Sequence, residues 1–240
     1  MIARSRKVIN LLSAQPLIVG TVHSVSGFRA AHRRAKNKVD LIEARVDAFE
    51  ENTDPLPALL ASEIPVIITI RHHREGGLRK LSEKERAALF MHLLPAATAI
   101  DIELRSVRAL GGVIAAAREK NVAVIGSHHD FQSTPSLPRL KALATAARNA
   151  RCDILKVAAL TKSAADLARL LEFLDAEKRM PLSLMGMGPV GKVSRLVLGL
   201  AGSVLNYGYL DREQVTGQWP AVELRKRLAE IGAAPPKRDR

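Results

Sequence analysis

The sequence has few aromatic residues and almost no cysteine. Aromatic side chains make up 3% of the 240 residues, and Cys152 is the only cysteine. A single thiol cannot form an intramolecular disulfide and makes a poor metal site. A core with so few aromatics must be filled by Leu, Ile, Val and Ala, which fill the interior of parallel α/β barrels. We therefore expect an α/β fold in a reducing compartment.

Long hydrophobic runs are missing as well. No segment approaches the roughly 18 apolar residues that a membrane-spanning helix needs. The apolar run at residues 8–12 is too short for the core of a signal peptide. We expect a soluble, cytoplasmic protein.

The length and apolar content of the chain indicate one large core. With 47% apolar residues, a single domain over residues 1–240 fits the chain better than two small ones. Residues 235–240 hold two prolines followed by charged residues, so we expect this tail to be frayed.

The charge of the chain is one-sided. Lys and Arg number 37 against 24 Asp and Glu, a formal net charge of +13. A basic nucleic-acid-binding module is therefore one hypothesis, which predicts steeply salt-dependent binding that survives Lys156→Ala. The basic residues are dispersed, however, and no aromatics alternate with them to stack on bases. We prefer a solvated surface, without a nucleic-acid or membrane partner, whose positive field concentrates a small anionic substrate.

Short runs rich in β-branched residues recur through the whole chain. We expect strands at residues 17–22, 39–46, 65–70, 99–104, 122–125, 154–158, 181–185 and 203–207. Between them lie amphipathic segments with helical spacing, for example 83–94, 140–149, 164–178 and 193–200. This alternation predicts right-handed βαβ units around a parallel sheet.

Eight such units favour the (β/α)8 TIM barrel. A doubly wound open sheet would give similar local patterns, but no glycine-rich dinucleotide fingerprint follows the first run. Residues that look chemically costly lie at or near the carboxyl ends of the runs, which converge on one mouth in a barrel. They are Glu43, Arg45, Arg71, Asp101, Glu103, His129, Lys156, Met185, Met187, Asn206 and Tyr207.

Lys156 stands inside an otherwise apolar run, Ile154-Leu155-Lys156-Val157-Ala158. Burial there would favour the neutral amine, which can attack a carbonyl. The alternative is a lysine that ends a strand and extends to solvent. The run alone does not decide between the two.

Histidines follow the fifth run, in Ser127-His128-His129-Asp130. One imidazole at the barrel mouth can move protons near neutral pH. Adjacent histidines could also suggest a metal, but neighbours on an extended segment point to opposite sides. No acidic cluster with ligand spacing completes a metal site, so we expect no metal.

Two arginines are candidate anion ligands. Arg71 begins a polar loop that contains Glu75 and a turn at Gly76 and Gly77. Arg195 lies near the start of the helix after the seventh run, where a guanidinium can grip a carboxylate in bidentate fashion. The alternatives are a simple polar loop and a helix-surface arginine.

Taken in order, these segments resemble the type I 3-dehydroquinate dehydratases, which are barrel lyases of the shikimate pathway of aromatic amino acid biosynthesis. The resemblance runs from about residue 17 to residue 218. The matching pieces are Glu43-Ala44-Arg45-Val46-Asp47, Arg71 with Glu75-Gly76-Gly77, Asp101-Ile102-Glu103-Leu104, Ser127-His128-His129-Asp130-Phe131, Asp153-Ile154-Leu155-Lys156-Val157-Ala158, Met185-Gly186-Met187-Gly188, Ser194-Arg195 and Gly217-Gln218. Each piece alone is unspecific, but the ordered set is specific.

The resemblance implies dehydration of 3-dehydroquinate to 3-dehydroshikimate through a Schiff base, with no cofactor or metal, by a homodimer. It makes Lys156 the imine-forming lysine and His129 the general base and acid. Glu75 matches the carboxylate that orients this histidine and would stabilise its protonated form.

The resemblance also implies the substrate-binding residues. Arg195 and Gln218 match positions that hold the substrate carboxylate, and Met185 and Met187 would form an apolar wall. Glu43, Arg45 and Arg71 match positions around the ring hydroxyls.

The chain departs from the family pattern in two places. His128 stands where related sequences often have Asn, and residues 213–218 lack the Ser and Ala-Pro that often precede the final Gly-Gln. Gln214 or Thr216 would replace the missing hydroxyl.

Another lysine Schiff-base barrel, such as a sugar-phosphate aldolase, is the alternative among enzymes. Only the short glycine-containing stretch 186–191 is available as a phosphate cradle. Inhibition by inorganic phosphate or turnover of an aldol substrate would favour this alternative.

Overall fold

The computed structural model of the chain describes residues 16–35, 38–51 and 53–232. The short apolar run at 8–12 and the tail at 235–240 lie outside these residues. Eight parallel strands form one sheet in the order β7-β6-β5-β4-β3-β2-β1-β8. They are β1 (Leu17–Val22), β2 (Leu41–Arg45), β3 (Val66–Thr69), β4 (Ala99–Glu103), β5 (Ala123–Asp130), β6 (Ile154–Leu160), β7 (Leu182–Met187) and β8 (Leu205–Tyr209).

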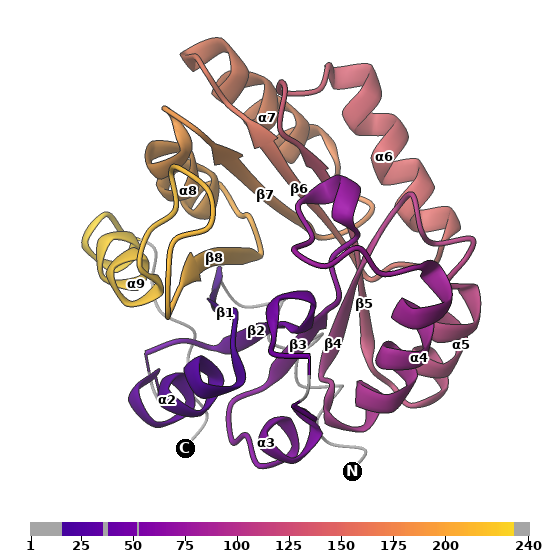
Figure 1. The fold of residues 1–240 in the computed structure, drawn as a ribbon. Helices are drawn as coiled ribbons and strands as arrows, with labels where there is room; N and C mark the ends of the chain where they lie inside the picture. The colour runs from indigo at the N-terminus through magenta and orange to yellow at the C-terminus, as the bar shows by residue number, and fades with distance from the viewer. Residues whose placement is uncertain (1–15, 36–37, 52, 233–240) are drawn as a thin grey trace.

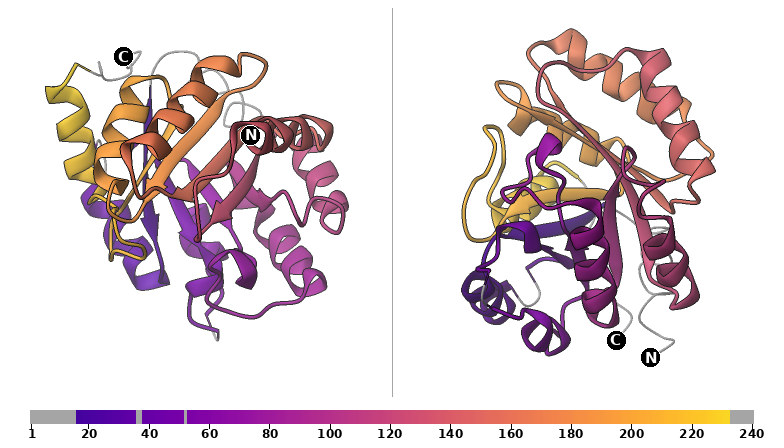
Figure 2. Two further views of the ribbon diagram at one scale, coloured as in Figure 1. Left: turned by 90° about the horizontal axis from the view of Figure 1, so that it is seen from above. Right: turned by 45° about the vertical axis from the view of Figure 1, so that its right-hand side comes forward.

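The two edges of the sheet meet and nearly close a barrel. The backbone N–H of Val204 donates to Leu182 O at 2.9 Å, and Ser183 Oγ donates to Leu205 O at 2.7 Å. Helices surround the strands on the outside (Figures 1 and 2). They are α2 (Val25–Ala35), α3 (Leu56–Leu60), α4 (Glu83–Leu93), α5 (Gly111–Glu119), α6 (Leu137–Asn149), α7 (Ala164–Ala176), α8 (Gly191–Leu200) and α9 (Ala221–Glu230), with single 3-10 turns at Val46–Ala48, His73–Glu75 and Leu94–Ala96. The predicted (β/α)8 barrel is confirmed.

Four of the eight strands, β5 to β8, reach further toward the mouth than the apolar runs predicted. β5 continues to Asp130 because His129 and Asp130 stay in register with Ala158 and Ala159 of β6. The histidines are therefore part of the strand and do not follow it. The end of the strand is not recognisable in the sequence, because the apolar pattern stops at the polar residues near the mouth while the backbone pairing continues.

Two apolar layers stabilise the barrel. The outer layer, between sheet and helices, includes the fully buried rings of Phe28, Phe90 and Phe173. The inner layer fills the bottom of the barrel with Leu17, Leu41, Ile67, Ala99, Ile125, Ile154 and Leu205. Side chains alternate along a strand, so the inward residue two positions above Ile154 is Lys156. The layer of charged side chains therefore lies directly above the apolar layer, on the side of the mouth.

Within the described residues no helix is both long enough and apolar enough to cross a membrane.

Candidate active site

A cavity of about 250 Å³ opens at the mouth of the barrel. The structure brings together all the residues to which the sequence assigned a catalytic or substrate-binding role. They are Glu43, Arg45, Arg71, Glu75, His129, Lys156, Met185, Met187, Arg195, Gln214 and Gln218. Thr21, His23, Phe131, Tyr207 and Val215 also line the cavity.

The amine of Lys156 lies at the floor of this cavity and the residue is 3% exposed. Its Nζ donates to Glu43 Oε1 at 3.1 Å and to Asp101 Oδ2 at 3.0 Å. The same atom lies 3.8 Å from the centre of the Tyr207 ring, a cation–π distance. Burial rules out the alternative of a lysine that extends to solvent. The amine is therefore buried, but it is hydrogen-bonded to two carboxylates. The sequence did not predict these two contacts.

Asp101 contacts two cations of the site. It accepts from Lys156 and, through both carboxylate oxygens, from the Arg71 guanidinium at 2.9 Å. Burial opposes its ionisation, but Arg71 and Lys156 outweigh burial and hold the pKa of Asp101 well below its usual range. Asp101 therefore stays an anion. The sequence placed Asp101 among the residues at the mouth but assigned it no catalytic or binding role.

Arg71 is 2% exposed and is engaged mainly by the protein itself. Besides Asp101, its Nη1 donates to Glu103 Oε1 at 2.9 Å and to Ser127 Oγ at 2.7 Å. These bonds fix the guanidinium rigidly in the wall of the cavity. The predicted contact with a ring hydroxyl would be an addition to this structural role.

His129 and Glu75 form a buried pair beside Lys156. Glu75 Oε2 lies 3.1 Å from His129 Nδ1 and accepts the His129 backbone N–H at 3.0 Å. Burial, with Arg71 and Lys156 adding to it, lowers the pKa of His129 well below its usual range. Burial raises the pKa of Glu75 to about 7. The imidazole is therefore a neutral base near neutral pH, whereas the sequence suggested that Glu75 favours its protonated form.

Arg195 is a buried cation without an ion-pair partner among the described residues. Its Nε donates to Gly217 O at 3.1 Å and its Nη1 to Tyr207 O at 2.6 Å. Burial lowers the pKa of this guanidinium to about 10, so it remains charged at neutral pH. A buried charge whose hydrogen-bond partners are two carbonyls and the Met185 sulfur is costly, and an anionic ligand would offset that cost. The alternative of a helix-surface arginine is wrong, because Arg195 is 3% exposed.

A family model described as type I 3-dehydroquinase matches residues 18–235. The chain belongs to this family. Membership makes the protein an enzyme and confirms the resemblance inferred from the ordered motifs.

Known members of the type I 3-dehydroquinase family agree with this assignment over most of the chain. The 3-dehydroquinate dehydratase of Thermococcus gammatolerans is 33% identical over 218 residues, 90% of this chain and 99% of that protein. A crystal structure of 3-dehydroquinate dehydratase from Geobacillus kaustophilus is 29% identical, with a TM-score of 0.82 and coverage of 90% and 91% of the two chains. A type I enzyme from Clostridium difficile, solved with covalently modified comenic acid, is 26% identical with a TM-score of 0.81, covering 91% and 92%.

The departures from the 3-dehydroquinase pattern left open whether Gln214 or Thr216 replaces the missing hydroxyl. Both residues lie in the loop between β8 and α9, residues 210–220. Gln214 lines the cavity, and its backbone N–H donates to the Gln218 side chain at 2.8 Å. Thr216 does not line the cavity, and its carbonyl accepts from the Gly188 N–H at 2.7 Å. The position of Gln214 in the cavity lining favours it over Thr216 as the replacement for the missing hydroxyl.

Asn206 was expected at the mouth, and this expectation is wrong. Leu205 and Tyr207 of β8 face the barrel interior, so Asn206 between them faces outward. Its side chain donates to Ser203 O at 2.9 Å and lies against Gly199 of α8. His128 likewise does not line the cavity, as the alternation along β5 predicted.

His23 is the main site residue that the sequence did not single out. It follows β1 directly, so the same rule that selected residues at the carboxyl ends of strands would have found it. Its partner Asp211 is 188 positions away and carries no local signal.

Metal ligands do not gather within the described residues. No group of three or more His, Cys, Asp or Glu side chains there is arranged to hold a metal ion.

Proposed function

We propose that the protein dehydrates 3-dehydroquinate to 3-dehydroshikimate through an imine between Lys156 Nζ and the substrate ketone. Dehydration of 3-dehydroquinate follows from the family assignment. The observation that supports the imine is the buried amine of Lys156 at the floor of the cavity, which His129, with a side chain 11% exposed, also lines. The Clostridium difficile relative, solved with a covalently modified ligand, is consistent with covalent chemistry in the family.

Imine formation joins the Lys156 nitrogen to the ketone carbon and releases the ketone oxygen as water. The amine must lose a proton before it can attack, and Glu43 and Asp101 are in hydrogen-bond contact with it. The resulting iminium ion withdraws electrons and acidifies the neighbouring carbon.

Elimination then requires one base and one acid, and His129 can serve as both. Its neutral imidazole takes the proton from the carbon beside the imine. The electron pair of that C–H bond forms the new double bond, and the hydroxyl on the next carbon leaves as water with the proton from His129. Hydrolysis of the imine returns free Lys156 and releases the enone product.

Substrate orientation falls to the cationic side of the cavity. Arg195 would bind the substrate carboxylate, with Gln218 and Gln214 closing over it from the loop between β8 and α9. Glu43, Arg45 and Arg71 would contact ring hydroxyls. Met185 and Met187, which are 4% and 5% exposed, would pack against the ring.

The test combines turnover with trapping. Absorbance of the conjugated enone should rise when 3-dehydroquinate is added, and Lys156→Ala should lower kcat by at least about a thousandfold. Borohydride should fix a covalent adduct that mass analysis locates on Lys156.

Lys192→Ala provides the matched control, because Lys192 is an exposed lysine that does not line the cavity. It should turn over and trap like the wild type. A wild type that neither turns over nor traps would contradict the proposal, and turnover of an aldol substrate would favour the aldolase alternative.

A further inference from the structure

His23 and Asp211 form a second histidine–carboxylate pair, in which His23 is buried and lines the cavity, whereas the Asp211 side chain is 19% exposed. The His23 backbone N–H donates to Asp211 Oδ2 at 2.6 Å, and its Nδ1 lies 3.0 Å from Asp211 Oδ1. Burial opposes ionisation of Asp211, but its hydrogen bonds from His23 outweigh burial and lower the pKa of Asp211. An ionised carboxylate only accepts hydrogen bonds. In the neutral form of the His23 ring, the proton is therefore on Nδ1, where Asp211 accepts it.

The other ring nitrogen, Nε2, is consequently a hydrogen-bond acceptor. It is buried and has no hydrogen-bond partner among the described residues, in a side chain that is 1% exposed. A buried acceptor without a partner destabilises the folded protein, because it has lost its hydrogen bonds to water. Because His23 lines the cavity, a ligand that donates a hydrogen bond can remove this cost.

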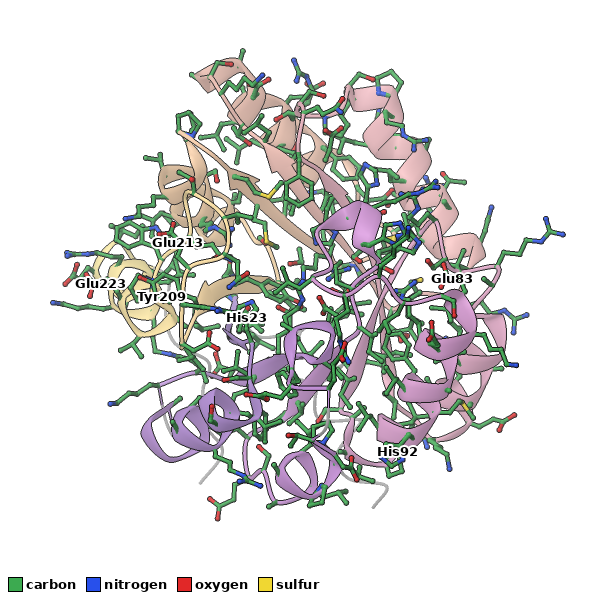
Figure 3. All side chains as sticks on the ribbon, viewed as in Figure 1. His23, Glu83, His92, Tyr209, Glu213 and Glu223 are labelled. Atoms are coloured by element: carbon green, nitrogen blue, oxygen red, sulfur yellow. The ribbon has the colours of Figure 1, made fainter. Side chains whose placement is uncertain are left out.

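The position of His23 in the barrel limits which part of the substrate it can meet. β1 and β5 are four strands apart in the order β7-β6-β5-β4-β3-β2-β1-β8, so His23 and His129 lie on opposite sides of the mouth. Figure 3 shows His23 near the middle of the molecule, whereas His92 and Glu223 lie at its periphery. His23 is therefore remote from the elimination and faces the opposite edge of the ring.

We infer that His23 Nε2 accepts a hydrogen bond from a ring hydroxyl of the substrate and selects for hydroxylated ring acids. The inference rests on the proposed function, which leaves hydroxyls as the donors on the substrate. Thr21, Glu43 and Arg45 of the adjoining strands β1 and β2 line the same side of the cavity. The hydroxylated edge of the ring would lie against this side.

A purely structural role for His23 is the competing explanation. Asp211 begins the part of the loop that carries Gln214 and Gln218, so the two bonds to Asp211 tie this loop to the end of β1. A structural tie explains the bonds at Nδ1 and the backbone N–H. It does not explain a buried Nε2 without a partner at the cavity wall.

Two substitutions separate these explanations. His23→Asn keeps an amide donor near the Nδ1 position but places no atom at Nε2. His23→Gln can place its carbonyl oxygen near Nε2 but loses the donor to Asp211. We expect His23→Asn to lower kcat/KM about tenfold, mainly through KM, and His23→Gln to stay within a few-fold of the wild type. The reverse order would show a structural tie and overturn the inference.

Substrate analogues that each lack one ring hydroxyl give a readout that a structural role would not move. For the analogue without the contacted hydroxyl, His23→Asn should change kcat/KM little, because the donor is already absent. An equal loss for every analogue would overturn the inference.

Wild-type turnover and the borohydride adduct on Lys156 are measured with the same preparations, and thermal melting shows that each variant is folded. Failure of the wild type in these assays would count against the proposed function. Failure of the His23 comparison with an active wild type would count against this inference alone.

Discussion

Glu75 and His129 show at the residue scale how burial tunes a pair of titratable groups. Both side chains are nearly inaccessible, at 5% and 11% exposure, and lie 3.1 Å apart. Burial disfavours the charged form of each, which raises the pKa of Glu75 to about 7 and lowers the pKa of His129. Protons therefore bind to the pair in coupled steps, and the active form is the one with ionised Glu75 and neutral His129.

This coupling predicts the pH dependence of kcat/KM. As pH falls through about 7, the first proton enters the pair at Glu75, and kcat/KM falls. At one pH unit below that value, about a tenth of the plateau should remain. Glu75→Gln removes this titration, so the acid limb should move to lower pH, where His129 alone titrates.

The check is a pH profile of initial rates for the wild type and the variant. Glu85→Gln changes an exposed carboxylate that caps α4, far from the cavity, and should leave the limb where it is. An acid limb that Glu75→Gln does not move would show that another group controls it.

At the element scale, two helices of equal length begin with serine but use it differently. The Ser163 side chain at the start of α7 accepts the Asp166 N–H at 3.3 Å, and Asp166 in turn accepts the Ser163 N–H at 3.1 Å. This capping box satisfies backbone donors that the helix leaves free. Ser136 at the start of α6 makes no side-chain cap bond.

Ser163→Ala should therefore lower the free energy of unfolding by about 1 kcal/mol, which lowers Tm by about 2–4 °C in a protein of this size. Ser136→Ala is the matched control and should change stability much less. Both residues are exposed, so packing hardly contributes. Equal effects in urea or thermal unfolding would mean that the cap bond of α7 has no net value.

At the scale of the whole molecule, an alternating series of buried charges lies under the cavity. It runs from Arg86 of α4 through Glu103, Arg71 and Asp101 to Lys156, and it ends at Glu43. Cations and anions balance along it, so each charge has partners of opposite sign. The series holds Lys156 in place and ties α4 to the strands.

Removal of a member of this series should be costly for the whole fold. Arg86 is fully buried and pairs with Glu103, which would be left without one of its two cationic partners. Arg86→Met should lower the free energy of unfolding by about 3–5 kcal/mol.

Arg227 of α9 offers the control for this prediction. It pairs with Glu223 at 2.7 Å and Glu230 at 3.0 Å, but its side chain is 44% exposed. Arg227→Met should cost less than about 1 kcal/mol. The measurement is denaturant unfolding of both variants. Similar losses in the free energy of unfolding would contradict the idea that burial makes the Arg86 ion pair important for stability.

The cytoplasmic location, the homodimer and the lack of a nucleic-acid partner belong to this scale too, and they stay predictions. We still interpret the net charge of +13 as the source of a positive field that attracts an anionic substrate.

The sequence by itself determined the alternation of strands and helices and most of the residues that line the cavity. Strand and helix periods depend on near neighbours, so residues 17–22 were predicted with the bounds that β1 has. Lys156 was identified because it interrupts an apolar run, and His129 and Arg195 because each lies in a short motif near a strand or helix end.

Only the tertiary structure decided how these residues are paired. The contact between Lys156 and Asp101 spans 55 positions, and that between His23 and Asp211 spans 188. Such contacts depend on strand register and on closure of the barrel, and local sequence patterns predict neither. The same register turned Asn206 outward and left His23 Nε2 buried at the cavity wall, because the pleat of each strand admits only every second side chain to the interior.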